Sequence, residues 1–245
     1  MKLSSVYKKG RYIKRKLTHP SCAAVIVAAG QASRMGGVDK ITAQLAGMPV
    51  LCRTLEAFDH NEMVDEVVVV AKAEKLEPIS SLCAAYPKVR LVVPGGATRL
   101  ESVRAGVSAV SEKIKFVAVH DGARPLVSDD VISNTIAKAI KFGAAAPAVH
   151  VKDTIKVSQS GAVDATPDRK KLFAVQTPQV FDCDLLKAAL QNAVDKHLDV
   201  TDDCSCVEAL GMNVQLTDGS EENIKITTPL DLDLAELILK KRTTV

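Results

Sequence analysis

The feature of this sequence that most constrains its fold is a buried-strand pattern that runs directly into a loop of small and basic residues. Residues 23–29, AAVIVAA, are entirely apolar, which predicts a strand buried on both faces of a parallel sheet. Residues 30–40, GQASRMGGVDK, add glycines and the cations of Arg34 and Lys40. Open α/β sheets bind ligands where their strands end in such loops. Backbone amides and two cations suit an anion, so the pattern predicts a loop that binds polyphosphate.

This loop matches neither of the common nucleotide-binding fingerprints. Ala32 stands where the G-x-G-x-x-G pattern requires its second glycine, and no Gly-Lys-Ser/Thr follows as in a Walker P-loop. The sequence therefore disfavours an NAD(P)-linked reductase on a Rossmann sheet and a P-loop NTPase. A loop that only turns the chain stays open as an alternative at this point, as does a nucleotide-binding module without catalysis.

Length and composition favour one α/β domain. The 245 residues are 47% hydrophobic, which is enough to build one substantial core. Residues 1–20 hold seven basic residues and no acidic ones, whereas the rest of the chain carries a net charge of −4. We expect residues 1–20 to form a disordered basic tail and residues 21–245 to form the domain. Aromatic residues make up only 3%, so we expect no nucleic-acid partner.

The cysteines and the N-terminal segment bear on location. Six cysteines are scattered without C-x-x-C spacing, which favours reduced thiols in a cytoplasmic protein over a zinc site. The basic tail followed by CAAVIVAAG could also be a secretory signal, but cleavage there would remove the first strand. Since no apolar run reaches the roughly eighteen residues of a membrane span, we expect no membrane partner.

Beyond the first loop the sequence alternates between strand and helix patterns, as in a parallel sheet with right-handed crossovers. We expect strands at Glu66–Ala71 and at residues 89–93, 116–120, 144–149, 213–216 and 222–226. We expect helices at residues 47–58, 73–85, 101–110, 127–141, 183–194 and 201–211, and a last one from residue 227. On that last helix, the spacing predicts an inward face made of Leu230, Leu234, Leu237 and Ile238.

Three more positions suit a nucleotide site. Residues 94–99, PGGATR, follow an expected strand, and Thr98 with Glu101 forms a capping-box pattern that marks the start of a helix. The free backbone amides of that helix start would therefore lie at the end of the strand. Asp121 also follows a strand, where a carboxylate suits Mg²⁺ together with phosphate oxygens and water. Lys225 alternates with two isoleucines and points to the opposite face. The alternatives are that residues 94–99 form only a capped loop, that Asp121 only forms a turn, and that Lys225 points into solvent.

Residues 150–173 depart from the alternating pattern. They are polar on both faces and centre on a Ser-Gly turn, which predicts a β-hairpin. A two-stranded ribbon is marginally stable by itself, so we expect this arm to pack on a second subunit in a homodimer.

Taken together, these segments resemble the 2-C-methyl-D-erythritol 4-phosphate cytidylyltransferase family over about residues 22–240. The motifs that carry the resemblance are AAGQASRMG…DK, GGATRLESV, HDGARP, KDTIK, QTPQ, TDD and NIKIT. The resemblance implies a single Rossmann-like nucleotidyltransferase domain with a mostly parallel central sheet and a protruding β-hairpin arm. It implies transfer of CMP from CTP to 2-C-methyl-D-erythritol 4-phosphate, with release of pyrophosphate, in the non-mevalonate isoprenoid pathway. Ribitol 5-phosphate cytidylyltransferases, which share the scaffold and chemistry, are the alternative.

The resemblance also implies roles for the matching residues. The residues expected to contact CTP are Ala28, Ala29, Gly30, Arg34, Lys40, Gly95, Gly96, Ser102, Gly122 and Ala123. Those expected to bind the polyol phosphate, some of them from the partner's arm, are Arg124, Thr154, Arg169 and Thr177. Asp121 would hold Mg²⁺, and the catalytic cations would be Arg34, Lys40 and Lys225. Ala32 departs from the family's usual second glycine, which leaves the details of the loop contacts open.

Overall fold

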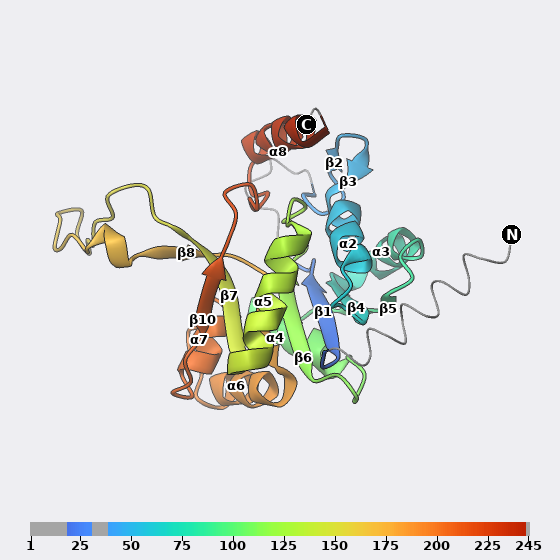
Figure 1. Cartoon of the computed structure of the whole chain (residues 1–245), viewed down its shortest axis with the longest axis horizontal. Helices are drawn as coiled ribbons and strands as arrows, with labels where there is room; N and C mark the ends of the chain where they lie inside the picture. The colour runs from blue at the N-terminus through green and yellow to red at the C-terminus, as the bar shows by residue number, and fades with distance from the viewer. Residues whose placement is uncertain (1–18, 31–38, 244–245) are drawn as a thin grey trace, which may run out of the picture.

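A mostly parallel sheet forms the centre of the structure, a computed structural model that describes residues 19–30 and 39–243 (Figure 1). Its strands are β1 (Cys22–Val27), β4 (Glu66–Ala71), β5 (Val89–Pro94), β6 (Phe116–Asp121), β7 (Ala144–His150), β8 (Phe173–Val175), β9 (Gln179–Asp182) and β10 (Gln215–Asp218). They follow the order β10-β7-β9-β6-β1-β4-β5, and β8 pairs with β7 beside this path. β1 runs parallel to both of its neighbours, whereas β9 is antiparallel to β6 and β7. The predicted α/β class and mostly parallel sheet are therefore confirmed.

Helices cover both faces of this sheet. They are α2 (Val50–His60), α3 (Leu76–Cys83), α4 (Arg99–Ser108), α5 (Asp129–Phe142), α6 (Cys183–Asp195), α7 (Asp203–Glu208) and α8 (Pro229–Thr243). The sheet separates two hydrophobic cores, and alternate residues of β1 pack into one or the other. Ala24 and Ile26 belong to the core that includes α2 and α5, whereas Ala23 and Val25 belong to the core that includes α4 and α6. Burial on both faces explains why the first strand is an uninterrupted apolar run.

The parallel strands bring their following loops to one edge of the sheet. β1, β4, β5 and β6 are consecutive neighbours that run in the same direction, so their carboxyl ends meet there. Helix α4 packs closely on the strands because Gly106 carries no side chain. A Cβ at this position would lie 2.4 Å from Cγ1 of Val25 and 2.7 Å from Cγ2 of Val70. The small residue thus fixes how the loop between β5 and α4 approaches the sheet.

Two expected strand segments take a different form. The expected strand at residues 222–226 is an irregular connection, held by a hydrogen bond of 2.8 Å from the Ile226 amide to the Ala123 carbonyl and by the fully buried side chain of Asn223. The expected hairpin at residues 150–173 contains one isolated antiparallel bridge, between Val157 and Ala165. The first segment is thus held by loop hydrogen bonds and by burial of Ile226 rather than by strand pairing, and a two-stranded ribbon such as the second is marginally stable by itself.

The expected inward face of the last helix is wrong. Leu230 is 73% exposed, and Leu234 and Leu237 are exposed as well, whereas Ala235 is fully buried. Ile238 does pack against the core. The helix was expected to turn its largest apolar residues inward, but it meets the body along a face that contains a small residue. Among the described helices, none has the length and apolar character needed to cross a bilayer.

Candidate active site

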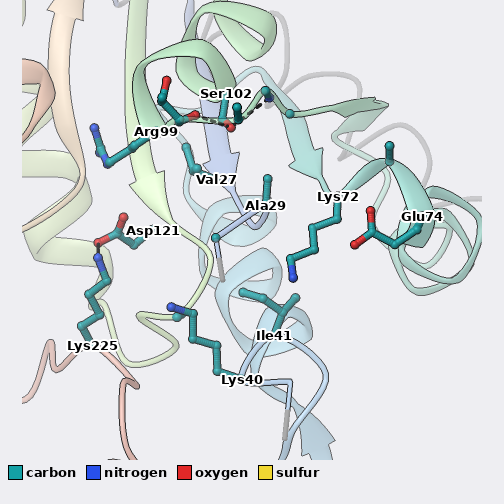
Figure 2. Close-up of a pocket in the computed structure, with 17 residues that line it drawn as sticks. Val27, Ala29, Lys40, Ile41, Lys72, Glu74, Arg99, Ser102, Asp121 and Lys225 are labelled. Carbon is teal, nitrogen blue, oxygen red and sulfur yellow. Dashed lines mark hydrogen bonds and ion pairs between the residues drawn. The ribbon is translucent and has the colours of Figure 1, made fainter. Parts of the chain in front are cut away.

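A cavity of about 480 Å³ opens at the edge where the parallel strands end (Figure 2). Four strand ends contribute to it, those of β1, β4, β5 and β6, together with the segment that precedes α8. Of the predicted site residues, the cavity is lined by Ala29, Gly30, Lys40, Gly95, Gly96, Ser102, Asp121, Ala123 and Lys225. Residues that are far apart in the sequence, from Val27 to Lys225, thus surround one cavity.

Three lysines reach this space from separate segments. Lys40 follows the first loop, Lys72 follows β4, and Lys225 precedes α8 (Figure 2). The Lys40 ammonium lies close to Gly30, because a Cβ built on Gly30 would be 3.9 Å from its Nζ atom. Three ammonium groups around one cavity make it attractive to a polyanion.

Asp121 lies at the carboxyl end of β6 among cations. Its Oδ2 atom is 2.9 Å from the Lys225 ammonium and 3.4 Å from Nε of Arg124. Burial alone would raise the pKa of this carboxyl group. The charges of Lys225, Arg99 and Arg124 outweigh burial and lower the pKa to about 2. Asp121 is therefore a carboxylate at any ordinary pH.

The backbone behind Asp121 is held by two buried polar side chains. The Asp121 amide donates to the Thr177 hydroxyl at 3.1 Å, and that hydroxyl lies 3.0 Å from Nδ1 of His120. The other ring nitrogen of His120 lies 3.2 Å from the carbonyl oxygen of Arg124, so Nε2 donates there and Nδ1 accepts. Burial lowers the pKa of His120 to about 4, against the opposing effect of Asp121. The ring is neutral and fully buried, so it supports the site without facing the cavity.

Lys225 is brought to the cavity by the irregular connection before α8. The guanidinium of Arg124 donates to the Asn223 carbonyl at 2.7 Å, and the Ile226 amide donates to Ala123. The side chain of Ile226 is fully buried while Lys225 points the other way, toward Asp121. The alternation read from the sequence correctly separates the two directions, although the segment is not a strand.

The loop between β5 and α4 forms a wall of small residues. A Cβ on Gly95 would lie 2.6 Å from Cβ of Ala29, so this position admits no side chain. The Gly96 amide donates to the Ser102 hydroxyl, and Glu101 accepts from the next two amides and completes the capping box with Thr98. Because these amides already have acceptors within the loop, the wall is suited to a base or ribose better than to phosphates.

Several predicted residues lie elsewhere. Ala28 and Gly122 pack against each other, since a Cβ on Gly122 would lie 3.2 Å from Cβ of Ala28. Thr177 is buried behind Asp121, and Arg124 touches Asp121 from outside the cavity lining. Thr154 and Arg169 lie on the arm, outside the cavity lining. Arg34 and Ala32 lie outside the described residues.

Three charged residues of the cavity lining were not predicted as site residues from the sequence: Lys72, Glu74 and Arg99. Lys72 follows β4, so the strand-end argument applied to the other loops would have found it. Arg99 makes a two-pronged ion pair with Asp203, with both N–O distances at 2.8 Å, and Asp203 is almost fully buried. The partners are 104 positions apart, and no local pattern indicates that they meet.

The parallel sheet, the small-residue loops at its strand ends and the cationic cavity around Asp121 define a nucleotidyltransferase of the Rossmann-like type. A sequence model of the family described as "2-C-methyl-D-erythritol 4-phosphate cytidylyltransferase" matches residues 22–241, so the chain belongs to this family.

Individual relatives agree with this assignment. The chain is 46% identical over 224 residues to the 2-C-methyl-D-erythritol 4-phosphate cytidylyltransferase of Desulforamulus reducens, which covers 89% of this chain and 96% of the relative. It is 43% identical to that of Caldanaerobacter subterraneus, over 89% and 98% of the two chains. Among solved structures, the 4-diphosphocytidyl-2C-methyl-D-erythritol synthase of Anaerococcus prevotii superposes with a TM-score of 0.82 at 30% identity, over 90% and 98% of the two chains.

Proposed function

We propose that the cavity transfers CMP from CTP to 2-C-methyl-D-erythritol 4-phosphate, the activity that the family carries in isoprenoid biosynthesis. The observation that supports this is the gathering of Lys40, Lys225 and Asp121 around one cavity at the strand ends. In the reaction, an oxygen of the 4-phosphate forms a bond to the α-phosphorus of CTP. The bond from that phosphorus to the bridging oxygen of the β-phosphate breaks, and pyrophosphate leaves.

The chemistry needs charge stabilisation more than proton transfer. A phosphate monoester has its second pKa near about 6, so the attacking oxygen is already ionised at neutral pH. The buried neutral ring of His120 agrees with a reaction that uses no general base at the cavity. The obstacle is repulsion between two anions, which Lys40 and Lys225 offset. Arg34, which lies outside the described residues, would add a further cation from the same loop as Lys40.

The lining divides into a phosphate end and a base end. Ala29, Gly30 and Lys40 would hold the triphosphate, since small residues and an ammonium lie together there. Gly95 and Ser102 would lie against cytosine and ribose, where the loop amides are already bonded. This placement orients the α-phosphate toward Asp121 and Lys225, where the second substrate would attack.

Mg²⁺ is proposed at Asp121. Within the described part of the chain there is no group of three or more side chains that could hold a metal by themselves. A single ionised carboxylate nevertheless fits Mg²⁺, which takes its other ligands from phosphate oxygens and water. The low pKa of Asp121 keeps that ligand charged. When bound with CTP, the ion would neutralise part of the triphosphate charge.

The activity has a direct test. Mixing the protein with CTP, Mg²⁺ and 2-C-methyl-D-erythritol 4-phosphate is expected to release pyrophosphate, measured by a coupled assay. Ribitol 5-phosphate in place of the first acceptor is expected to release far less, because the family assignment does not favour it. A reaction without acceptor controls for CTP hydrolysis. Faster release with ribitol 5-phosphate, or none with either acceptor, would contradict the proposal.

The arm, residues 150–173, is proposed to complete the site of a second subunit in a homodimer. Its apolar side chains Ile155, Val157 and Val163 are 39%, 46% and 59% exposed, which suits a covered surface better than a solvated one. Thr154 and Arg169 lie on this arm and outside the cavity of their own subunit. The six cysteines are buried and free, which supports the proposed cytoplasmic location.

Shared sites predict complementation between damaged subunits. Arg169→Ala is expected to raise KM for the polyol phosphate about tenfold or more, because a charged hydrogen bond to phosphate is lost. In a heterodimer purified with two affinity tags, one subunit carries Arg169→Ala and the other Lys40→Ala. One of its two sites is intact, so about half of wild-type turnover is expected. A heterodimer no more active than the mean of the two damaged homodimers would show that the arm serves its own subunit.

A further inference from the structure

An ion pair between Lys75 and Asp39, which is next to Lys40 in the chain, joins two walls of the cavity. The ammonium of Lys75, in the short 3₁₀ turn η1 (Ala73–Lys75) after β4, contacts Oδ2 of Asp39. The Asp39 side chain is 22% exposed and that of Lys75 is 37% exposed, so the pair is partly shielded from water. Asp39 immediately precedes Lys40, and η1 carries the cavity residues Ala73 and Glu74. The pair therefore connects the wall that bears Lys40 with the wall that follows β4.

Asp39 also organises the turn from which Lys40 projects. Its other carboxylate oxygen, Oδ1, accepts the Ile41 amide at 3.0 Å, which closes a side-chain turn around Lys40. Its backbone carbonyl accepts from Thr42 at 3.2 Å and from Ala43 at 2.8 Å. Two oxygen atoms of Asp39 thus accept three hydrogen bonds from the amides that follow Lys40.

The far side of the turn is anchored independently. Ile41 is 3% exposed and packs in the core, and its carbonyl accepts the Leu51 amide at 3.0 Å. The Ala43 carbonyl accepts the Val50 amide, also at 3.0 Å. These bonds fix residues 41–43 to the start of α2. On the other side of Lys40, the contact of the Asp39 carboxylate with Lys75 holds residue 39 against η1.

The charge state of Asp39 agrees with this arrangement. Burial would raise its pKa, but the hydrogen bond from Lys75, the Ile41 amide and the charges of Lys75 and Lys72 lower it below the ordinary value. Asp39 is therefore ionised at neutral pH, and it draws Lys75 while the Ile41 amide holds its second oxygen.

We propose that Asp39 and Lys75 are positioning residues that hold the ammonium of Lys40 in place for the transfer reaction. The inference rests on the proposed function, because it assigns these two residues to the same site. Because both side chains keep part of their surface in water, the pair is expected to contribute little to stability and to act mainly on the rate. When a group that stabilises a transition state is displaced by about 1 Å, the rate can fall by about 10²-fold.

Three substitutions separate the contacts. Asp39→Asn keeps an oxygen for the Ile41 amide and removes the charge, Lys75→Met removes only the ion pair, and Asp39→Ala removes both contacts. The first two are expected to lower kcat by about threefold to tenfold and Asp39→Ala by about tenfold or more. Lys75→Arg keeps the charge and is expected to restore most of the rate. KM for the polyol phosphate and the melting temperature are expected to change little.

The decisive measurement repeats the substitutions in a Lys40→Ala background. If Asp39 and Lys75 act through Lys40, neither Asp39→Ala nor Lys75→Met lowers kcat further there. A matched control is Arg104→Met, which removes a surface hydrogen bond to Gln191 away from the cavity lining and is expected to leave kcat unchanged in both backgrounds.

The outcomes distinguish the positioning role from the proposed function. If Lys40→Ala is strongly impaired while Lys75→Met and the Asp39 variants keep wild-type kcat, the positioning role is wrong and the function stands. Losses of the same factor in both backgrounds also overturn the positioning role, because they do not depend on Lys40. If Lys40→Ala itself turns over at the wild-type rate, the catalytic assignment of Lys40 fails and the inference with it. Should Asp39→Ala fail to fold, Lys75→Met in both backgrounds decides the question.

Discussion

Lys40→Ala is expected to lower kcat for pyrophosphate release by about 10²-fold or more, the loss typical for removing one donor that stabilises charge in the transition state. The side chain lines the cavity and lies close to Gly30, within reach of a triphosphate bound in the cavity. Its charge matters most as negative charge builds up around the α-phosphorus, so kcat is expected to fall more than the affinity for CTP. Steady-state kinetics with CTP varied at saturating acceptor would separate the two effects.

Lys113→Ala provides the control for this substitution. Lys113 is exposed and precedes β6, at the edge of the sheet opposite the cavity, so its loss changes the net charge equally without touching the site. The control is expected to retain wild-type kcat. Equal losses in the two variants would point to a general electrostatic effect, and wild-type turnover of Lys40→Ala would remove Lys40 from the reaction.

The strands and their following loops could be predicted from the sequence because their signals are local. The run of apolar residues in β1 and in β4 reflects burial on both faces, and it needs no knowledge of the partners. Once these strands are parallel, their loops must meet at one edge. Gly95, Asp121 and Lys40 therefore come together as the sequence predicts.

Long-range partners and the choice of helix face could not be predicted in the same way. The ion pair of Arg99 with Asp203 depends on how α7 packs near the start of α4. The antiparallel β9 lies between β6 and β7, and nothing in its four residues specifies that position. On α8, leucines repeat at helical spacing, yet the helix packs through Ala235. Periodicity indicates that an apolar stripe exists, and the space left by the body determines which stripe is covered.

Asp121→Asn is expected to lower kcat by about 10²-fold to 10³-fold, comparable to or larger than the effect of losing Lys40. The substitution keeps the shape of the side chain. It also keeps the hydrogen bond from the backbone amide of residue 121 to the Thr177 hydroxyl, so the strand end is preserved. It removes the carboxylate proposed to hold Mg²⁺ and the anionic partner of Lys225. Turnover measured over a range of Mg²⁺ concentrations would show a lower maximum rate and a weaker dependence on the ion. A wild-type maximum rate at any Mg²⁺ concentration would exclude Asp121 as a required ligand.

The same substitution predicts a pH dependence of stability. The folded-state pKa of Asp121 is about 2, below the ordinary value of 3.8, so the carboxylate stabilises the folded protein above pH 3.8. This contribution is lost as the pH falls through the folded-state pKa, because protonation removes the attraction to Lys225 and Arg124. The free energy of unfolding of wild type is therefore expected to exceed that of Asp121→Asn at pH 7 and to approach it near pH 2. Urea unfolding of both proteins from pH 7 downward would measure this difference. A difference that stays constant across the range would mean that the cations around Asp121 do not hold it as a carboxylate, and the ion site proposed on that carboxylate would lose its physical basis.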